Sequence, residues 1–158
     1  MENSIILNND FHLIIDGLLL GSLCGAEYII KENKADHIIS LLTKDDYDWP
    51  QFEGLFESCK IQRTHIEIED AQDVDITVYL DDVADLIHKL LQDKKIVYLH
   101  CYAGKSRSPA FAIYYLMKYK HMSFIQAHDF VGSRRSVIYP NRRFIKDLKR
   151  MEVKLKMV

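Results

Sequence analysis

The sequence has few of the residues that cross-link a chain or interrupt its regular structure. Its 158 residues include 3 cysteines, 3 prolines and 6 glycines. Three cysteines are too few, and odd in number, for a disulfide scaffold, which favours a reduced compartment, either the cytoplasm or the nucleus. So little glycine and proline also excludes a collagen-like fibre and a disordered, low-complexity chain.

Long apolar runs and targeting signals are missing as well. Runs such as Leu18–Leu20 are far shorter than the roughly 20 residues that span a bilayer. No charged and then apolar signal peptide opens the chain, and residues 154–158 contain no cysteine that could be prenylated. The sequence therefore predicts no membrane anchor.

The net charge of −2 excludes a strongly basic surface over the whole chain, which is typical of nucleic-acid-binding proteins. This balance hides two opposed regions. Between Asp45 and Asp85, thirteen acidic residues stand against two basic ones, and from Arg134 onward nine basic residues stand against two acidic ones. Two solvated faces are the simpler interpretation, and a basic surface for an anionic partner is the alternative.

Apolar residues make up 48% of the chain and form short β-rich runs that alternate with amphipathic helical patterns. The expected strands are 11–15, 18–20, 37–42, 63–69 and 95–100. The expected helices are 24–34, 76–91, 106–120, 123–134 and 141–154, and residues 43–57 form an acidic loop or a short helix. Asp75 is a candidate N-cap. The alternation predicts one α/β domain over 1–158, with a mostly parallel sheet of about five strands flanked by helices and with the strand at 95–100 in its centre.

The segment from His100 to Ser108 carries the strongest chemical signal, because it follows a buried strand and opens a helix. A tight turn at this place directs backbone N–H groups toward one point, and Gly104 permits the turn. Cys101 lies at its mouth, where the helix and amide dipoles favour the nucleophilic thiolate. Arg107 suits two phosphate oxygens, and Ser108 can donate its hydroxyl to the thiolate. A lone cysteine is usually a small buried hydrophobe, but this combination favours a nucleophile.

Residues 100–108 read His-Cys-Tyr-Ala-Gly-Lys-Ser-Arg-Ser, which resembles the His-Cys-x5-Arg signature of the cysteine-dependent protein tyrosine phosphatases. Residues 103–108 look closest to the dual-specificity phosphatases, and 134–141 resemble the catalytic domains of MAP-kinase phosphatases. The resemblance implies the fold of that superfamily and no metal or other cofactor. It implies that the phosphate is bound by Tyr102, Ala103, Gly104, Lys105, Ser106 and Arg107. We also expect His100 to hold Cys101 in place by hydrogen bonds.

The resemblance further implies that Asn141 supports the phosphate loop, although this residue is also a candidate helix N-cap. A general acid must face the thiolate across the phosphate, and three carboxylates compete for this role. Asp75 is expected to cap the helix, Asp70 resembles the family's general acid in position, and Asp73 is the second candidate for the general acid. The expected mechanism is attack by Cys101, a cysteinyl-phosphate, and acid/base catalysis by Asp70.

The expected reaction is hydrolysis of phosphotyrosine and phosphoserine/threonine in proteins, since no insertion suggests a deep phosphotyrosine-selective pocket. Four arginines beside the loop could read an acidic or doubly phosphorylated substrate, namely Arg134, Arg135, Arg142 and Arg143. A MAP kinase substrate is an analogy only, because residues 1–10 are too few for a kinase-docking domain. The sequence predicts no oligomeric state.

Two other functions remain open from the sequence. A phosphoinositide or RNA 5′-phosphatase of the same superfamily is one of them. Lys105 matches a loop lysine of the lipid-acting members, whereas Tyr102 and Ser106 replace a basic residue and a glycine that are usual in those enzymes. A phosphoprotein-binding pseudophosphatase is disfavoured because Cys101, Arg107 and Asp70 are all present. The remaining cysteines, Cys24 and Cys59, are structural in the simpler interpretation, and the alternative is a disulfide with an oxidised Cys101.

Overall fold

A five-stranded sheet forms the centre of the computed structural model, which describes residues 10–47 and 49–157. Its strands are β1 (Phe11–Ile15), β2 (Leu18–Gly21), β3 (His37–Leu41), β4 (Gln62–Ile66) and β5 (Val97–His100). The order across the sheet is β1-β2-β5-β3-β4, in which β2, β5, β3 and β4 are parallel and β1 is antiparallel to β2. The predictions of a mostly parallel sheet and of a central β5 are confirmed. Of residues 1–10, which were expected to be too few for a docking domain, 1–9 lie outside the described residues.

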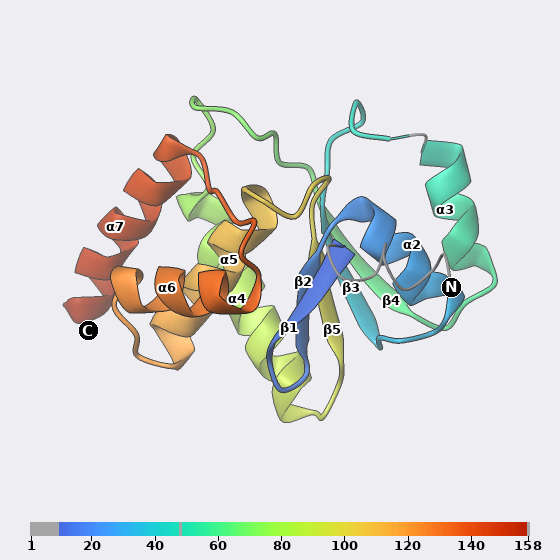
Figure 1. The fold of residues 1–158 in the computed structure, drawn as a ribbon, viewed down its shortest axis with the longest axis horizontal. Coiled ribbons are helices and arrows are strands. Elements are labelled where there is room, and N and C mark those ends of the chain that lie inside the picture. Colours follow the sequence, from blue (N-terminus) through green and yellow to red (C-terminus); the bar gives the residue numbers. More distant parts are fainter. Residues whose placement is uncertain (1–9, 48, 158) are drawn as a thin grey trace.

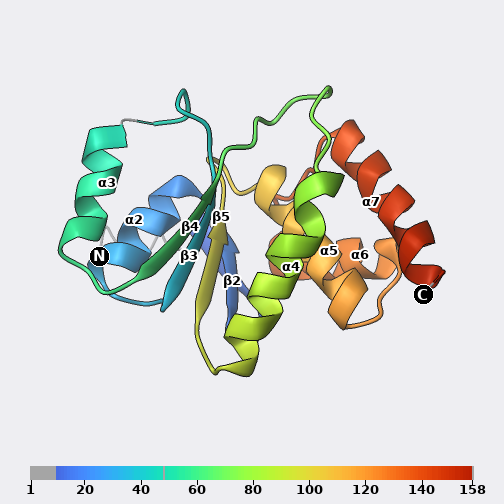
Figure 2. The ribbon, with the colours of Figure 1, turned by 180° about the vertical axis from the view of Figure 1, so that it is seen from behind.

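Helices cover both faces of the sheet (Figures 1 and 2). On one face lie α2 (Leu23–Lys31) and α3 (Trp49–Glu57), so the acidic 43–57 stretch is part loop and part helix. On the other lie α4 (Thr77–Gln92), α5 (Arg107–Tyr119), α6 (Phe124–Arg134) and α7 (Arg142–Lys156). The described helices contain none long and apolar enough to cross a membrane.

The sheet separates two apolar clusters because successive side chains of a strand point to opposite faces. In β5, Val97 and Leu99 join the cluster under α4–α7, whereas Tyr98 joins the cluster under α2 and α3. Helix α5 packs against the sheet and against α4, α6 and α7, and its residues from Arg107 to Met117 are all buried. The core therefore fixes both β5, which ends at His100, and the first turn of α5.

Two local predictions shift once the pairing is known. Strand β4 ends at Ile66 rather than at residue 69, because its only described partner, β3, ends at Leu41, which pairs with Ile66. The N-cap of α4 is Ile76 rather than Asp75. The Asp75 carboxylate still accepts hydrogen bonds from the N–H and the hydroxyl of Thr77, so it stabilises the helix start from one position earlier.

Candidate active site

The loop that we call the anion loop (Cys101–Ser106) joins the carboxyl end of central β5 to the first turn of α5 (Figure 1). The ends of parallel strands at this edge are the usual place for a ligand in an open α/β sheet. Helix α5 also directs the positive end of its dipole toward this loop. The fold therefore brings the predicted nucleophile, Cys101, to a place suited to anions.

The carbonyl groups of the anion loop all point toward the protein. Each of the five carbonyl oxygens from Cys101 to Lys105 accepts a hydrogen bond. The donors are His100 Nδ1 (3.0 Å), Leu23 N (2.9 Å), Arg135 Nη2 (3.1 Å), Arg135 Nε (2.8 Å) and Tyr139 N (2.6 Å), in that order. Because C=O and N–H of a trans peptide point in opposite directions, the N–H groups of residues 102–106 face away from these donors. The loop thus presents an anion-binding face.

Gly104 is required for this backbone path. Its φ is +67°, and an added Cβ would lie 2.6 Å from the carbonyl carbon of Gly21. Both the left-handed conformation and the contact with β2 disfavour any other residue. The sequence assigned this role to Gly104, and the geometry supplies its reason.

The Cys101 thiol lies at the base of the loop, only 2% exposed, with its Sγ 3.2 Å from the hydroxyl oxygen of Ser108. Ser108 is fully buried in the first turn of α5, so its hydroxyl is held in this place. The other loop side chains differ in exposure. Tyr102 and Lys105 are exposed, and Ser106 is buried.

His100 is buried and its burial lowers its pKa to about 3, so the ring is neutral at physiological pH. The carbonyl oxygen of Cys101 can only accept, so Nδ1 donates to it (3.0 Å) and Nε2 accepts from the Ser40 hydroxyl (2.6 Å). His100 therefore orients the peptide bond after Cys101, as the sequence led us to expect. The contribution of Ser40 was not foreseen.

Arg107 is buried and held by Asp46, a residue that the sequence analysis did not single out. Nη1 donates to Asp46 Oδ2 (2.7 Å) and to the Ile68 carbonyl (3.0 Å), and Nη2 donates to Asp46 Oδ1 (3.2 Å). Burial alone would lower the pKa of Arg107, but the Asp46 hydrogen bonds and charge raise it. Of the five guanidinium N–H groups, the contacts of the described residues leave Nε–H and one Nη2–H on one edge for an anion.

Asp46 is itself fixed by the start of its own loop. Its Oδ2 accepts from the Thr43 N–H (2.7 Å) and hydroxyl (3.1 Å). Burial on its own would raise the pKa of the Asp46 carboxyl, but the bonds from Arg107 and Thr43 lower it, so Asp46 remains ionised. The sequence contains one weak indication that Asp46 belongs to the site, because Asp46 follows a predicted parallel strand at the edge of the sheet where ligands bind.

Asp70 lies in the loop between β4 and α4, residues 67–76, which we call the acid loop. Its Oδ1 accepts from the Ser106 hydroxyl (2.7 Å) and from Asn141 Nδ2 (2.8 Å). Of the three competing carboxylates, Asp70 is the one that bonds to the anion loop within the described part of the chain. Asp75 accepts hydrogen bonds from Thr77 at the start of α4, and Asp73 has no hydrogen bond to the anion loop among the described residues.

Asn141 connects the acid loop, the anion loop and α7. Its side-chain oxygen caps α7 by accepting from Phe144 N (2.9 Å), and its own N–H donates to the Ser106 hydroxyl (2.9 Å). With the bond to Asp70, one residue performs both of the roles that the sequence suggested.

Helix α7 holds the rest of the acid loop. The Arg143 N–H donates to Gln72 Oε1 (3.1 Å), and Asp147 Oδ2 accepts from the Ile76 N–H (3.2 Å). Asp147 is fully buried, and its Oδ1 accepts from Arg143 (3.0 Å) and Arg150 (3.2 Å). The acid loop is therefore fixed mainly by Asn141 and by residues of the helix that follows it.

The prediction that Arg135 reads the substrate is wrong. Arg135 is 1% exposed, donates to the carbonyls of Ala103 and Gly104, and also donates to His12 Nδ1 (3.0 Å). Its charge is used to hold the anion loop from behind. Arg134 lies over the Phe130 ring on the surface, and Arg143 binds the acid loop.

The other two cysteines differ from Cys101. Cys24 is exposed on α2, and its pKa is raised by partial burial and by the charges of Asp10 and Glu27, which disfavours a reactive thiolate. Cys59 is half-buried and its thiol donates to the Phe56 carbonyl. A disulfide with Cys101 stays a prediction. No cluster of three or more metal-ligating His, Cys, Asp or Glu side chains occurs over residues 10–47 and 49–157.

Known proteins resemble this chain in sequence and in fold. A probable dual specificity protein phosphatase of Dictyostelium discoideum is 34% identical over 149 residues, which cover 94% of this chain and 36% of the relative. The human dual specificity protein phosphatase 21 is 41% identical over 95 residues, or 60% of this chain and 50% of the relative. The chain thus spans half or less of these two relatives.

A solved structure, that of the human tyrosine phosphatase-like serine/threonine/tyrosine-interacting protein, matches with a TM-score of 0.80 at 25% identity. The match covers 92% of this chain and 97% of that one. The family model for the catalytic domain of dual specificity phosphatases matches residues 19–154, which include the anion loop, the acid loop and Asn141. On these grounds the chain belongs to the dual specificity phosphatase family.

Proposed function

We propose that this chain hydrolyses phosphotyrosine and phosphoserine/threonine in proteins through a cysteinyl-phosphate intermediate. One observation carries the proposal. The Cys101 thiol lies in a loop whose amides face an anion site, with the free edge of Arg107 beside it and with Asp70 bound to the same loop through Ser106. A nucleophile, a charge-stabilising site and a proton donor are thus held together.

In the first step, the Cys101 thiolate attacks phosphorus and forms an S–P bond while the P–O bond to the substrate breaks. The loop amides and the Nε/Nη2 edge of Arg107 bind the equatorial oxygens, whose charge they stabilise in the transition state. Asp70 donates its proton to the departing oxygen. Both described hydrogen bonds to this carboxyl fall on Oδ1, so Oδ2 is the oxygen that carries the proton.

In the second step, Asp70 takes a proton from a water molecule that attacks phosphorus. The new P–O bond forms, the S–P bond breaks, and inorganic phosphate leaves. The Ser108 hydroxyl, 3.2 Å from the sulfur, donates a hydrogen bond to the departing thiolate. Asp70 is then protonated and the thiolate restored, as the next cycle requires.

Family membership supports phosphoprotein substrates, with MAP kinases among the candidates by analogy. A cysteine that must stay reduced to act as a nucleophile favours a reducing compartment, such as the cytoplasm or nucleus. A phosphoprotein-binding pseudophosphatase is disfavoured because Cys101, Arg107 and Asp70 are all present and because Asp70 bonds to the anion loop through Ser106. Phosphoinositides and RNA 5′-phosphates are tested below as competing substrates.

The test compares wild type with Cys101→Ser, Arg107→Lys and Asp70→Asn on phosphotyrosine and phosphothreonine peptides, an aryl phosphate, phosphoinositides and a 5′-phosphorylated RNA. Cys101→Ser and Arg107→Lys should lose turnover on every substrate. Asp70→Asn should lose about 100-fold or more in kcat on peptides, but less on an aryl phosphate whose leaving group needs no proton. Asp73→Asn is the matched control and should keep wild-type rates.

Three outcomes contradict part or all of the proposal. Peptide hydrolysis that survives in Cys101→Ser rules out the cysteinyl-phosphate, and turnover confined to lipids or RNA rules out the substrate class. If Asp73→Asn, not Asp70→Asn, shows the leaving-group dependence, the acid is Asp73.

A further inference from the structure

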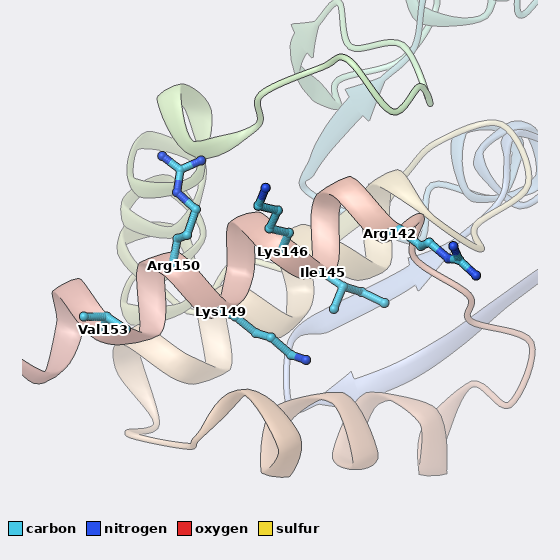
Figure 3. A pocket seen from close by; sticks show the side chains of 6 residues that line it. All are labelled: Arg142, Ile145, Lys146, Lys149, Arg150 and Val153. Atoms are coloured by element: carbon cyan, nitrogen blue, oxygen red, sulfur yellow. The ribbon is translucent and has the colours of Figure 1, made fainter.

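The outer face of α7 carries a stripe of basic residues that the proposed reaction does not use. A shallow pocket of about 460 Å³ lies along this face. It is lined by Arg142, Ile145, Lys146, Lys149, Arg150 and Val153. Figure 3 shows these side chains following one another along the helix, with Arg142 at one end and Val153 at the other. We call this face the basic strip.

The basic strip opposes the stability of its own helix. Arg142 lies in the first turn of α7, where the helix dipole favours acidic residues, and the first turn contains none. Arg142, Lys146 and Arg150 follow at intervals of four residues, at which like charges repel one another. Arg150 offsets part of this repulsion by its ion pair with Asp147, but helix stability alone would not select Arg142 and Lys146, and a bound anion would offset the repulsion between them.

The cationic groups of the strip are only partly neutralised. No carboxylate of the described residues lies within ion-pair distance of Arg142 or Lys146. Lys149 lies over the Phe124 ring, and Arg150 binds the buried Asp147. Between the charges, half-buried Ile145 and exposed Val153 leave an apolar floor.

The strip begins at the proposed active site. Arg142 follows Asn141, whose N–H bonds to Ser106 of the anion loop and whose side chain bonds to Asp70. From Arg142 to Arg150 the helix rises about 12 Å at 1.5 Å per residue. An extended peptide covers that distance with about four residues.

We propose that the basic strip binds an acidic segment of the phosphoprotein substrate, a few residues away from the phosphorylated side chain. This inference rests on the proposed phosphatase function and specifies its substrate class. Carboxylates of the segment would pair with Arg142, Lys146 and Lys149, and an apolar side chain between them would contact Ile145 and Val153. An acidic segment with an apolar side chain complements the strip, because the strip is basic and its floor is apolar.

A polypeptide fits this strip better than the other polyanions. Single-stranded RNA is held by stacking on aromatic rings, and the described residues that line the pocket include no aromatic side chain. A membrane-surface helix inserts large apolar side chains on the face opposite its charges. Here the apolar residues Ile145 and Val153 lie among the charges instead.

The test uses the full chain and three phosphotyrosine peptides of equal length. One has glutamates on the N-terminal side of the phosphotyrosine, one has them on the C-terminal side, and one has glutamines instead. The strip variant is Lys146→Glu with Lys149→Glu. Its matched control is Lys60→Glu with Lys89→Glu, which changes the net charge equally at exposed positions away from the anion loop, before β4 and near the end of α4.

Wild type should prefer one acidic peptide over the neutral one by about tenfold in kcat/KM, mostly through KM, because a few exposed ion pairs add uniform binding. The preference should shrink as salt is raised from 0.05 to 0.5 M. The strip variant should lose the preference while it keeps wild-type rates on the neutral peptide and on an aryl phosphate. The control variant should keep the preference.

Equal rates of wild type on all three peptides would overturn the inference, as would a preference that the strip variant retains. Phosphatidylserine vesicles provide the competing arm. If wild type binds them, the strip variant does not, and the peptides are hydrolysed alike, then the strip is a lipid-binding surface and the inference is wrong. Failure to hydrolyse any phosphopeptide would instead reject the proposed function itself.

Discussion

The anion loop and the acid loop meet at Ser106, yet the protein holds them in different ways. The anion loop is fixed through its backbone, since each carbonyl from Cys101 to Lys105 has a donor and the Cys101 side chain is 2% exposed. The acid loop is fixed by the Asn141 side chain, the Arg143 N–H and the Asp147 side chain, in α7 or at its N-cap, and its Asp70 is exposed. One loop is held through its peptide groups, and the other through side-chain hydrogen bonds around an exposed carboxylate and through two buried isoleucines, Ile68 and Ile76.

This difference follows from what each loop would do. Backbone dipoles stabilise charge without reorganisation only if they already point at the ligand, which requires a rigid frame behind them. A group that gives a proton and later takes one from water must be reached by solvent and by the substrate. Rigidity is therefore concentrated behind the anion loop, and accessibility at Asp70.

The largest expected effect removes the frame of the anion loop. Arg135→Met removes the donor from the buried Gly104 carbonyl and from the partly buried Ala103 carbonyl, which should lower the free energy of unfolding by about 3 kcal/mol. It should also weaken inorganic phosphate binding, because the amides lose their orientation. Arg134→Met, next to it but on the surface, is the control and should change stability by less than about 0.5 kcal/mol. Equal unfolding midpoints in denaturant for the two variants would show that the loop needs no such frame.

A second test uses the buried histidine behind the nucleophile. Unfolded His100 takes up a proton near pH 6.5 and folded His100 only near pH 3, so stability falls as pH drops through this window. At pH 5 the loss should be about 2 kcal/mol relative to pH 7.5. Denaturant unfolding of wild type and of His100→Gln across this range measures it, and the variant should show a smaller slope. The same slope in both proteins would mean that His100 is not held neutral.

The smallest expected effect loosens the acid loop. Asp147→Asn removes the charge that holds Arg143 and Arg150 while it keeps an oxygen for the Ile76 N–H. We expect kcat on phosphopeptides to fall by about fivefold to tenfold, but little change on an aryl phosphate with a good leaving group. Asp82→Asn, an exposed carboxylate on α4, is the control. An equal fall on both substrates would place the damage in the anion loop rather than in acid catalysis.

The sequence predicted what is local and periodic. Residues 100–108 are contiguous, so the roles proposed for Cys101, Arg107 and Ser108 could be inferred from the residue types and their spacing in this one segment. The mostly parallel sheet and its central strand followed from the alternation of strands and helices. The general acid was narrowed to two aspartates, and only the folded chain shows which one contacts Ser106.

The rest depends on contacts between distant parts of the chain. Asp46 precedes Arg107 by 61 residues, and Ser40 precedes His100 by 60. Nothing in a basic run distinguishes Arg135, which is buried, from Arg134, which is exposed. The charge pattern shows only that both residues are basic. Which of the two is buried depends on how α6 packs against the sheet, and the sequence does not reveal this packing.

The donors to the anion loop also determine when, during synthesis, the loop becomes complete. Leu23 belongs to an early helix, but Arg135 and Tyr139 follow α6. A nascent chain that has emerged only through α5 therefore contains Cys101 and two of the five donors, but it lacks the donors to the carbonyls of residues 103–105. The Cys101 thiol is therefore translated before the carbonyls of the anion loop have all their hydrogen-bond donors. Phosphate binding by the anion loop should thus be coupled to docking of the segment that follows α6, which is translated after the loop itself.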